Sequence, residues 1–177
     1  MELIEGVATV DDLDAFVARL GAVGDEHGVT VQAFDARLVV DRAHLERAVG
    51  LADRAIARGE NVARERSVEI LLYAAGTRQI DRALDVGVSE GECPTVVLVD
   101  AVAGEESSET DDAERRGAAA VRNIERGGTL GPAETLGASD PERVREYFDV
   151  GDAELDAVDG TLADVVRERV ALLDVEK

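Results

Sequence analysis

The sequence predicts a mixed α/β domain of the α+β type, rich in helix and with a small central β-sheet. Two observations lead to this prediction: apolar residues recur at helical spacing in most segments, and the run 95–100 (TVVLVD) has the composition of an interior strand. The chain has 177 residues, with no internal repeat and no long linker. We therefore expect one compact domain over residues 1–177.

The first elements are predicted to be two strands with a helix between them. Residues 2–6 form a short candidate strand. Thr9 stands three residues before Asp12, a capping-box pattern that predicts a helix ending near Gly24. Polar and apolar residues alternate over residues 29–34, which predicts the second strand.

Two further helices are predicted in the middle of the chain. Asp41 is placed to cap a helix that ends at Arg58, directly before Gly59. The segment 67–75 is apolar on nearly all sides, which indicates a helix that is buried on most of its surface. Gly76-Thr77 is expected to stop this helix and to cap a short helix that follows.

The second half of the chain is predicted to be mostly helical after the strand at 95–100. Residues 103–112 are acidic and contain serine and glycine, so we expect a solvated loop. A helix is expected over 113–126, and the glycines of 127–131 indicate a turn or the entry to a strand. Asp140-Pro141 is expected to start another helix, and Asp152 and Thr161 are expected to cap two more, with Thr161 in a capping-box pattern with Asp164.

The composition is strongly acidic and still suits a folded core. Aspartate and glutamate number 39 against 19 lysines and arginines, the formal net charge is −20, and 45% of residues are hydrophobic. Such a chain repels itself at low salt, and molar salt screens the repulsion because the Debye length falls to about 3 Å. Lysine occurs once, at Lys177. We therefore expect a salt-loving source organism, and the net charge does not exclude an anionic partner.

Few residues suit catalysis or metal binding. Cys93 is the single cysteine, which excludes a disulfide framework, and we expect it to be a small, semi-buried residue. His27 and His44 are expected in surface or capping roles, because no second ligand stands at helical spacing from either. No nucleophile elbow, phosphate-binding loop or dinucleotide motif is present. We expect no enzyme activity, no metal and no cofactor.

The sequence also predicts a cytoplasmic protein. No apolar run approaches the roughly 20 residues of a membrane span. Residues 1–7 lack the basic start of a signal peptide.

Positive charge is concentrated in the segment 36–82. Nine arginines and seven acidic residues give this segment a net charge of +2, against −22 for the rest of the chain. These arginines can pair with neighbouring acids, as on any charged helix. They can also grip phosphate with two donors and stack on bases, so a basic island on an acidic body suits selective contact with nucleic acid. Arg47, Arg54 and Arg58 are expected on one helix face, and Arg64 and Arg66 follow it.

The tetrad Gly76-Thr77-Arg78-Gln79 combines a helix break, a hydroxyl, a guanidinium and an amide at the start of one helix. Tyr73 stands close by on the apolar helix. Single-stranded RNA ends are recognised by such mixtures of stacking, hydrogen bonds and phosphate contacts. Spacing alone favours structural capping for these residues.

Two strings resemble a known family. They are ILLYAAGTRQI at residues 70–80, preceded by Glu69, and ERVALL at residues 168–173, and Gly-Glu-Asn at 59–61 matches the family as well. The chain resembles the small accessory subunit of the KEOPS complex, the TPRKB family, in its archaeal type. The similarity covers roughly residues 29–173.

This resemblance implies a compact α/β domain that is not an enzyme. It implies binding to the kinase/ATPase-like KEOPS subunit, which contacts the threonylcarbamoyl transferase subunit, and a role in making threonylcarbamoyladenosine in tRNA. It also implies that the chain grips the single-stranded 3′ CCA end of tRNA. The positions that match the family motif are Tyr73, Gly76, Thr77, Arg78 and Gln79. The arginine-rich segment adds Arg54, Arg58, Arg64 and Arg66 as supporting phosphate contacts.

Two alternatives remain open at this stage. The chain could be a purely protein-binding module of the kinase-like subunit, which the −22 charge of the remainder fits equally well. It could also be a small-molecule enzyme, but the sequence offers no strongly perturbed acid or base for that role. The sequence does not reveal which surface binds the kinase-like subunit.

Overall fold

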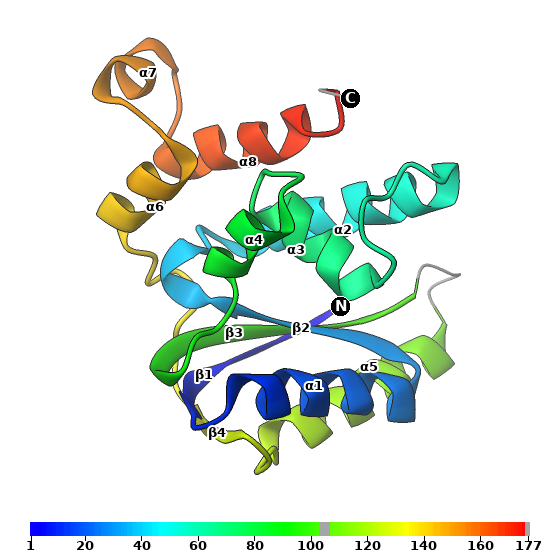
Figure 1. Cartoon of the computed structure of the whole chain (residues 1–177). Helices are drawn as coiled ribbons and strands as arrows, with labels where there is room; N and C mark the ends of the chain where they lie inside the picture. Colours follow the sequence, from blue (N-terminus) through cyan, green and yellow to red (C-terminus); the bar gives the residue numbers. More distant parts are fainter. Residues whose placement is uncertain (103–106, 176–177) are drawn as a thin grey trace. The chain divides into compact units, whose positions relative to one another are not determined.

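The computed structural model describes residues 1–102 and 107–175 (Figure 1). The chain forms two compact units, each made from two separate stretches of sequence. The first unit contains Met1–Asp35 and Val88–Thr135, and the second contains Ala36–Gly87 and Leu136–Lys177. The helix-rich mixed α/β fold with a small sheet is confirmed, and one domain over residues 1–177 stays a prediction.

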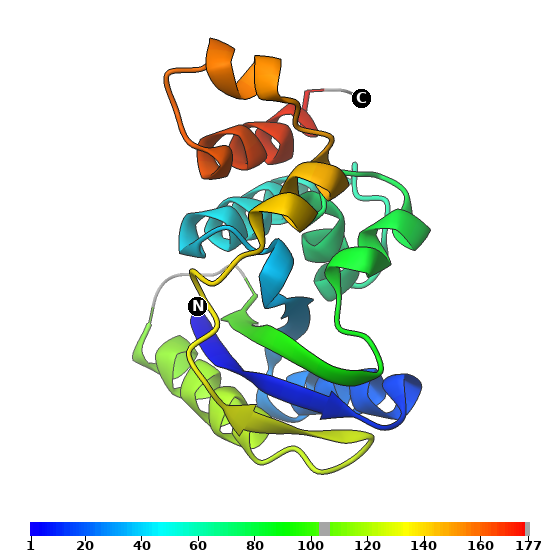
Figure 2. The same cartoon turned by 90° about the vertical axis from the view of Figure 1, so that its left-hand side faces the viewer.

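A four-stranded antiparallel sheet is the framework of the first unit. Its strands are β1 (Glu2–Val10), β2 (Val29–Asp35), β3 (Gly91–Ala101) and β4 (Gly128–Pro132), in the spatial order β2-β3-β1-β4. Strand β3 pairs on both sides, with Val97 opposite Ile4 of β1 and opposite Ala33 of β2. The interior strand predicted at 95–100 is therefore confirmed, and Figure 2 shows β4 beside β1 at one edge.

Two helices cover one face of this sheet, namely α1 (Leu13–His27) and α5 (Ser108–Arg122) (Figure 1). The first core includes Phe16, Leu20 and Val97, all buried. Gly117 lies where α5 packs against strands β2 and β3. A Cβ there would stand 2.9 Å from Val29 Cγ2, so this glycine permits the close packing of helix on strand.

The second unit is helical. Its elements are the 3₁₀ turn η1 (Ala36–Leu38), α2 (Arg42–Arg58), α3 (Arg66–Ala74), α4 (Ile80–Ala83), the 3₁₀ turn η2 (Leu84–Val86), α6 (Pro141–Phe148), α7 (Asp152–Ala157) and α8 (Leu162–Leu172). Helix α2 packs against α3 and α8, and α6 packs against α8 and η1. Leu45, Ile70 and Val166 are fully buried, so the unit has its own apolar interior.

Several predicted helix ends are confirmed. The Asp41 carboxylate accepts a hydrogen bond from the His44 backbone N–H at 2.8 Å, and Gly59 closes α2 with a φ of 69°. Asp140 caps α6, and Thr161 forms the predicted reciprocal capping box with Asp164 at the start of α8. The predicted buried helix at 67–75 is α3.

Other predicted boundaries are wrong near the start of the chain. Thr9 does not cap a helix, because β1 continues to Val10 and Thr9 pairs with Glu92 and Thr129 in the sheet. Asp12 is the N-cap of α1, and its carboxylate accepts from the Ala15 N–H at 2.9 Å. The helix continues past the predicted end at Gly24 and finishes at His27.

The predicted acidic loop at 103–112 is partly wrong. Residues 103–106 lie outside the described residues, but α5 already begins at Ser108 with Ser107 as its N-cap. Glu109 and Asp111 stabilise this helix start, because carboxylates interact favourably with the positive end of the helix dipole. The same helix ends at Arg122, four residues before its predicted end.

Three smaller predictions also need correction. Thr77 does not cap α4; Gln79 occupies the N-cap position, and the Thr77 hydroxyl accepts from the Gln79 backbone N–H at 3.2 Å. Asp152 is the first residue of α7, and Gly151 takes the N-cap position before it. Cys93 is fully buried, where semi-burial was expected, because it lies within β3 in the core of the first unit.

Within residues 1–102 and 107–175, no helix combines the length and the hydropathy that a membrane span requires. Across those same residues, no group of three or more metal-ligating side chains comes together.

Candidate functional site

The motif segment 69–80 spans most of α3, the turn 75–79 and the first residue of α4, all in the second unit. The turn ends α3 through hydrogen bonds from the Gly76 N–H to the Tyr73 carbonyl and from the Thr77 N–H to the Leu72 carbonyl. Gly76 has a φ of 61°, which residues with a Cβ rarely adopt. The glycine of the motif is therefore required by the backbone of this turn.

Arg78 connects the motif turn to the end of α8. Its Nη2 donates to the Leu173 carbonyl at 3.0 Å, and the side chain is partly buried. Leu173 is the C-cap of α8, where carbonyls lack partners within the helix. Arg78 thus has a structural contact of its own beside its predicted role in RNA binding.

Tyr73 is buried, with 1% of its surface exposed. Burial raises the pKa of Tyr73, the charge of Asp174 raises it further, and the positive charge of Arg78 opposes this shift. A ring buried in this way offers no face to a base. Tyr73 is therefore part of the apolar interior at the end of α3, and its contact with RNA stays a prediction.

The predicted arginine face of α2 runs along α8. Arg47 Nη1 donates to the Arg167 carbonyl at 3.4 Å, and Arg58 Nη1 lies 3.9 Å from an Asp174 carboxylate oxygen. Arg58 and Arg78 therefore both reach the carboxyl end of α8. Arg54, on the same face, is exposed and has no ion pair within the described part of the chain.

The two arginines that follow α2 differ in their contacts. Arg66 makes a bidentate ion pair with Asp53, with donor–acceptor distances of 2.7 and 2.9 Å, and only 11% of its side chain is exposed. Arg64 is exposed, and among the described residues it has neither an ion pair nor a hydrogen bond. Both stand at the opposite end of α3 from Arg78, and a helix of this length measures about 13 Å. The structure therefore separates them from the motif turn.

The loop between α2 and α3 is held by a buried carboxylate. Glu69 is 1% exposed, and its Oε2 accepts from the backbone N–H groups of Val62 at 3.0 Å and Ala63 at 2.9 Å. Sequence reasoning missed this role. One signal was available: Glu69 is the single acid of α3 and is followed by apolar residues to the end of the helix, and a carboxylate buried in such a setting needs hydrogen-bond partners.

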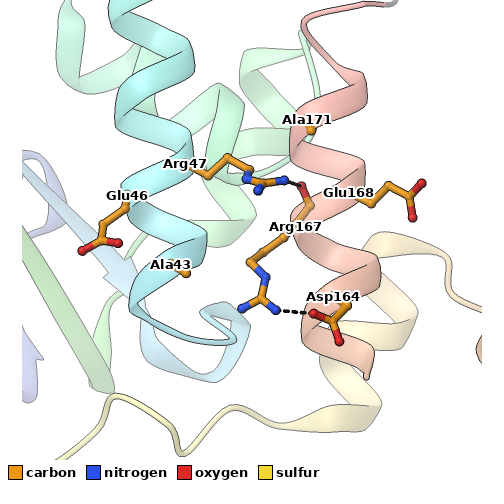
Figure 3. A pocket seen from close by; sticks show the side chains of 7 residues that line it. All are labelled: Ala43, Glu46, Arg47, Asp164, Arg167, Glu168 and Ala171. Atoms are coloured by element: carbon orange, nitrogen blue, oxygen red, sulfur yellow. Dashed lines mark hydrogen bonds and ion pairs between the residues drawn. The ribbon is translucent and has the colours of Figure 1, made fainter. Parts of the chain in front are cut away.

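An open groove of about 700 Å³ lies between α2 and α8 (Figure 3). Arg47 and Arg167 reach toward the space between the helices, while Glu46 and Glu168 point away from it (Figure 3). Arg167 forms ion pairs with Asp41 and Asp164. These arginines tie the two helices together at this groove.

His44 is fully buried, so of the two predicted roles, surface or capping, the surface role is wrong. Its Nε2 lies 2.8 Å from the Ala74 carbonyl, which can only accept, so Nε2 carries the proton. The Val40 N–H lies 3.4 Å from Nδ1, and the Phe148 ring packs edge-on against the imidazole at 6.0 Å. Burial lowers the pKa of His44. The neutral imidazole joins the start of α2 to the end of α3.

A second contact that the sequence did not suggest joins α4 to α6. Arg82 Nη2 donates to the Tyr147 carbonyl at 3.0 Å, and the Tyr147 hydroxyl donates to the Arg82 carbonyl at 2.8 Å. Burial raises the pKa of Tyr147 to about 12. This reciprocal pair fixes the short helix that follows the motif turn.

The second unit thus presents an ordered turn, exposed arginines and a loop held by a buried carboxylate. The chain matches the family described as kinase binding protein CGI-121 over residues 12–174. The chain therefore belongs to this family, which confirms the resemblance to the TPRKB family. The comparison with curated proteins finds no match for this sequence.

Proposed function

We propose that the chain is the non-catalytic accessory subunit of a KEOPS complex. In this role it binds and activates the kinase/ATPase-like subunit, which in turn contacts the threonylcarbamoyl transferase subunit. The observation that carries this proposal is membership of a kinase-binding family across residues 12–174. The complex modifies tRNA in the cytoplasm, and the acidic composition suits an archaeal source that lives in high salt.

The proposal includes recruitment of tRNA through its 3′ CCA end. Support comes from exposed arginines on the second unit: Arg54 on α2 and Arg64 on the loop before α3 have no ion pair within the described part of the chain. Gln79 is exposed at the start of α4 and offers an amide for hydrogen bonding. Arg58 and Arg78 contact residues at the carboxyl end of α8, Thr77 precedes Arg78 in the motif turn, and Arg66 holds the start of α3 through Asp53.

The second candidate is a protein-binding subunit with no RNA contact. It is favoured by the contacts that the arginines already make: Arg66 pairs with Asp53, and Arg78 donates to the Leu173 carbonyl. An arginine held within the protein has fewer donors left for phosphate. The −20 net charge adds a general repulsion of RNA at low salt.

Alanine substitutions at exposed arginines distinguish the two candidates. Arg54→Ala and Arg64→Ala remove cations without breaking a described contact, and Arg116→Ala on α5 is the matched control in the first unit. We expect the first two to weaken tRNA binding by the complex by about tenfold each, with capture of the kinase-like subunit unchanged. Unchanged tRNA binding in both variants would favour the protein-only subunit.

A further inference from the structure

We propose that Glu69 is a positioning residue that holds Arg64 for contact with an RNA phosphate. It acts through the loop of residues 59–65, which joins α2 to α3. This inference rests on the proposed tRNA-binding function and assigns different roles to residues that the sequence placed in one set.

Side-chain hydrogen bonds hold the loop itself and the start of the helix that follows it. The Glu69 carboxylate accepts from the Val62 and Ala63 backbone N–H groups. The Asn61 side chain donates to the Ala63 carbonyl at 2.7 Å. Directly after the loop, Arg66 clamps the start of α3 to α2 through its bidentate pair with Asp53.

These contacts order a segment that contributes little to the apolar interior. Ala63 is buried, but Val62 is 46% exposed and Arg64 and Glu65 are exposed. Arg64 follows directly after the two residues that Glu69 holds, so the direction of its Cα–Cβ bond depends on their position. An arginine fixed at its backbone loses less conformational entropy on binding a phosphate. The buried carboxylate therefore pre-organises an exposed cation.

For Glu69→Ala, the loss of a negative charge and the loss of positioning predict opposite changes in tRNA affinity. Glu69→Ala and Glu65→Ala each remove one negative charge near Arg64, and electrostatics alone predicts tighter RNA binding for both. Glu65 makes no side-chain cap bond to α3, so its loss leaves the loop contacts in place. If Glu69 positions Arg64, Glu69→Ala weakens tRNA binding by about three- to tenfold, while Glu65→Ala leaves it unchanged or tighter.

A double-mutant cycle with Arg64→Ala tests the proposed route. We expect the effect of Glu69→Ala on tRNA affinity to vanish when Arg64 is already alanine, because the residue that it positions is gone. Hydrogen exchange of the Val62 and Ala63 amides should quicken in Glu69→Ala with or without RNA. An equal loss of affinity in both backgrounds, or tighter binding by Glu69→Ala, would overturn the inference.

Asn61→Ala provides a milder variant should Glu69→Ala fail to fold. It removes the bond to the Ala63 carbonyl and leaves the Glu69 carboxylate in place, so we expect a smaller loss of affinity that also depends on Arg64. A loss that is independent of Arg64 would contradict the inference. Failure of the proposed tRNA-binding function can be distinguished from failure of this inference alone. In the first case the wild-type chain binds no tRNA, alone or with its partner, and the inference fails as well. In the second case the wild-type chain binds tRNA, but the effect of Glu69→Ala does not depend on Arg64.

Discussion

The Arg78 guanidinium donates a hydrogen bond from Nη2 to the Leu173 carbonyl at 3.0 Å. Leu173 closes α8, and a cation at this end of a helix satisfies a carbonyl and interacts favourably with the helix dipole. Residues 95 positions apart in the sequence are joined in this way. The contact explains why the two strings that carry the family resemblance, at 70–80 and 168–173, lie together in the second unit.

Arg78→Ala should destabilise the protein because a partly buried carbonyl loses its charged donor. We expect the free energy of unfolding to fall by about 1–3 kcal/mol, measured by denaturant titration in molar salt. Arg54→Ala is the control, since this exposed arginine has no described ion pair and its removal should stay within about 0.5 kcal/mol. Equal stability of the two variants would contradict a structural role for Arg78.

Gly76→Ala should destabilise the motif turn. The φ of 61° is strained for alanine, so we expect a loss of about 1 kcal/mol in the free energy of unfolding. Gly50→Ala is a control for which we expect the opposite change in the free energy of unfolding. Gly50 lies within α2, and a Cβ added there would have nothing within 4 Å. Alanine should therefore stabilise the protein by about 0.5–1 kcal/mol. An unchanged free energy of unfolding in Gly76→Ala would contradict this prediction and show that the turn accepts alanine without strain.

The Arg66–Asp53 pair should contribute to stability beyond an ordinary surface ion pair, because it is bidentate and partly buried. A double-mutant cycle with Arg66→Ala and Asp53→Ala should give a coupling energy of about 1 kcal/mol. The exposed pair Arg115–Asp112 on α5 is the comparison, and we expect a smaller coupling there. A larger coupling at Arg115–Asp112 would refute the assignment.

His44 should make stability depend on pH. Its pKa is lowered in the folded state by burial, so the unfolded chain binds a proton more readily than the folded chain. The neutral imidazole contributes its full share to the free energy of unfolding above the ordinary histidine pKa of about 6.5. This contribution is lost as pH falls below that value. We expect wild-type stability to fall more steeply from pH 7 toward pH 5 than that of His44→Gln. Parallel pH profiles would count against this assignment.

The sequence correctly predicted those elements that neighbouring residues mark, either by capping residues at both ends or by a continuous apolar run. The predicted bounds of α2 agree with the structure because Asp41 and Gly59 are both capping residues. The interior of β3 was predicted because its apolar run is continuous. In an acidic chain the pattern of a threonine followed by an acid also arises by chance, so Thr9 was misassigned. Strand β4 is glycine-rich and becomes a strand because it pairs with β1, a contact between distant residues.

The turn that carries the candidate motif was predictable from the sequence, and the contacts of its residues were less so. The motif string pointed to the turn 75–79, which the structure shows as an ordered connection. Sequence could not tell which arginines pair, because Asp53 lies thirteen residues before Arg66 and Leu173 lies far beyond Arg78. The buried roles of His44 and Glu69 depend on tertiary contacts of the same kind.

The measurement that tests the account most directly is tRNA binding in molar salt, with an intact tRNA and the same tRNA lacking its CCA end. Phosphate attraction weakens steeply with salt, so a signal that survives reports stacking and direct hydrogen bonds at the RNA end. We predict binding that requires the CCA end, by the chain alone or with the kinase-like subunit. Equal binding of both RNAs, or binding of neither while the kinase-like subunit is still captured, would contradict the account.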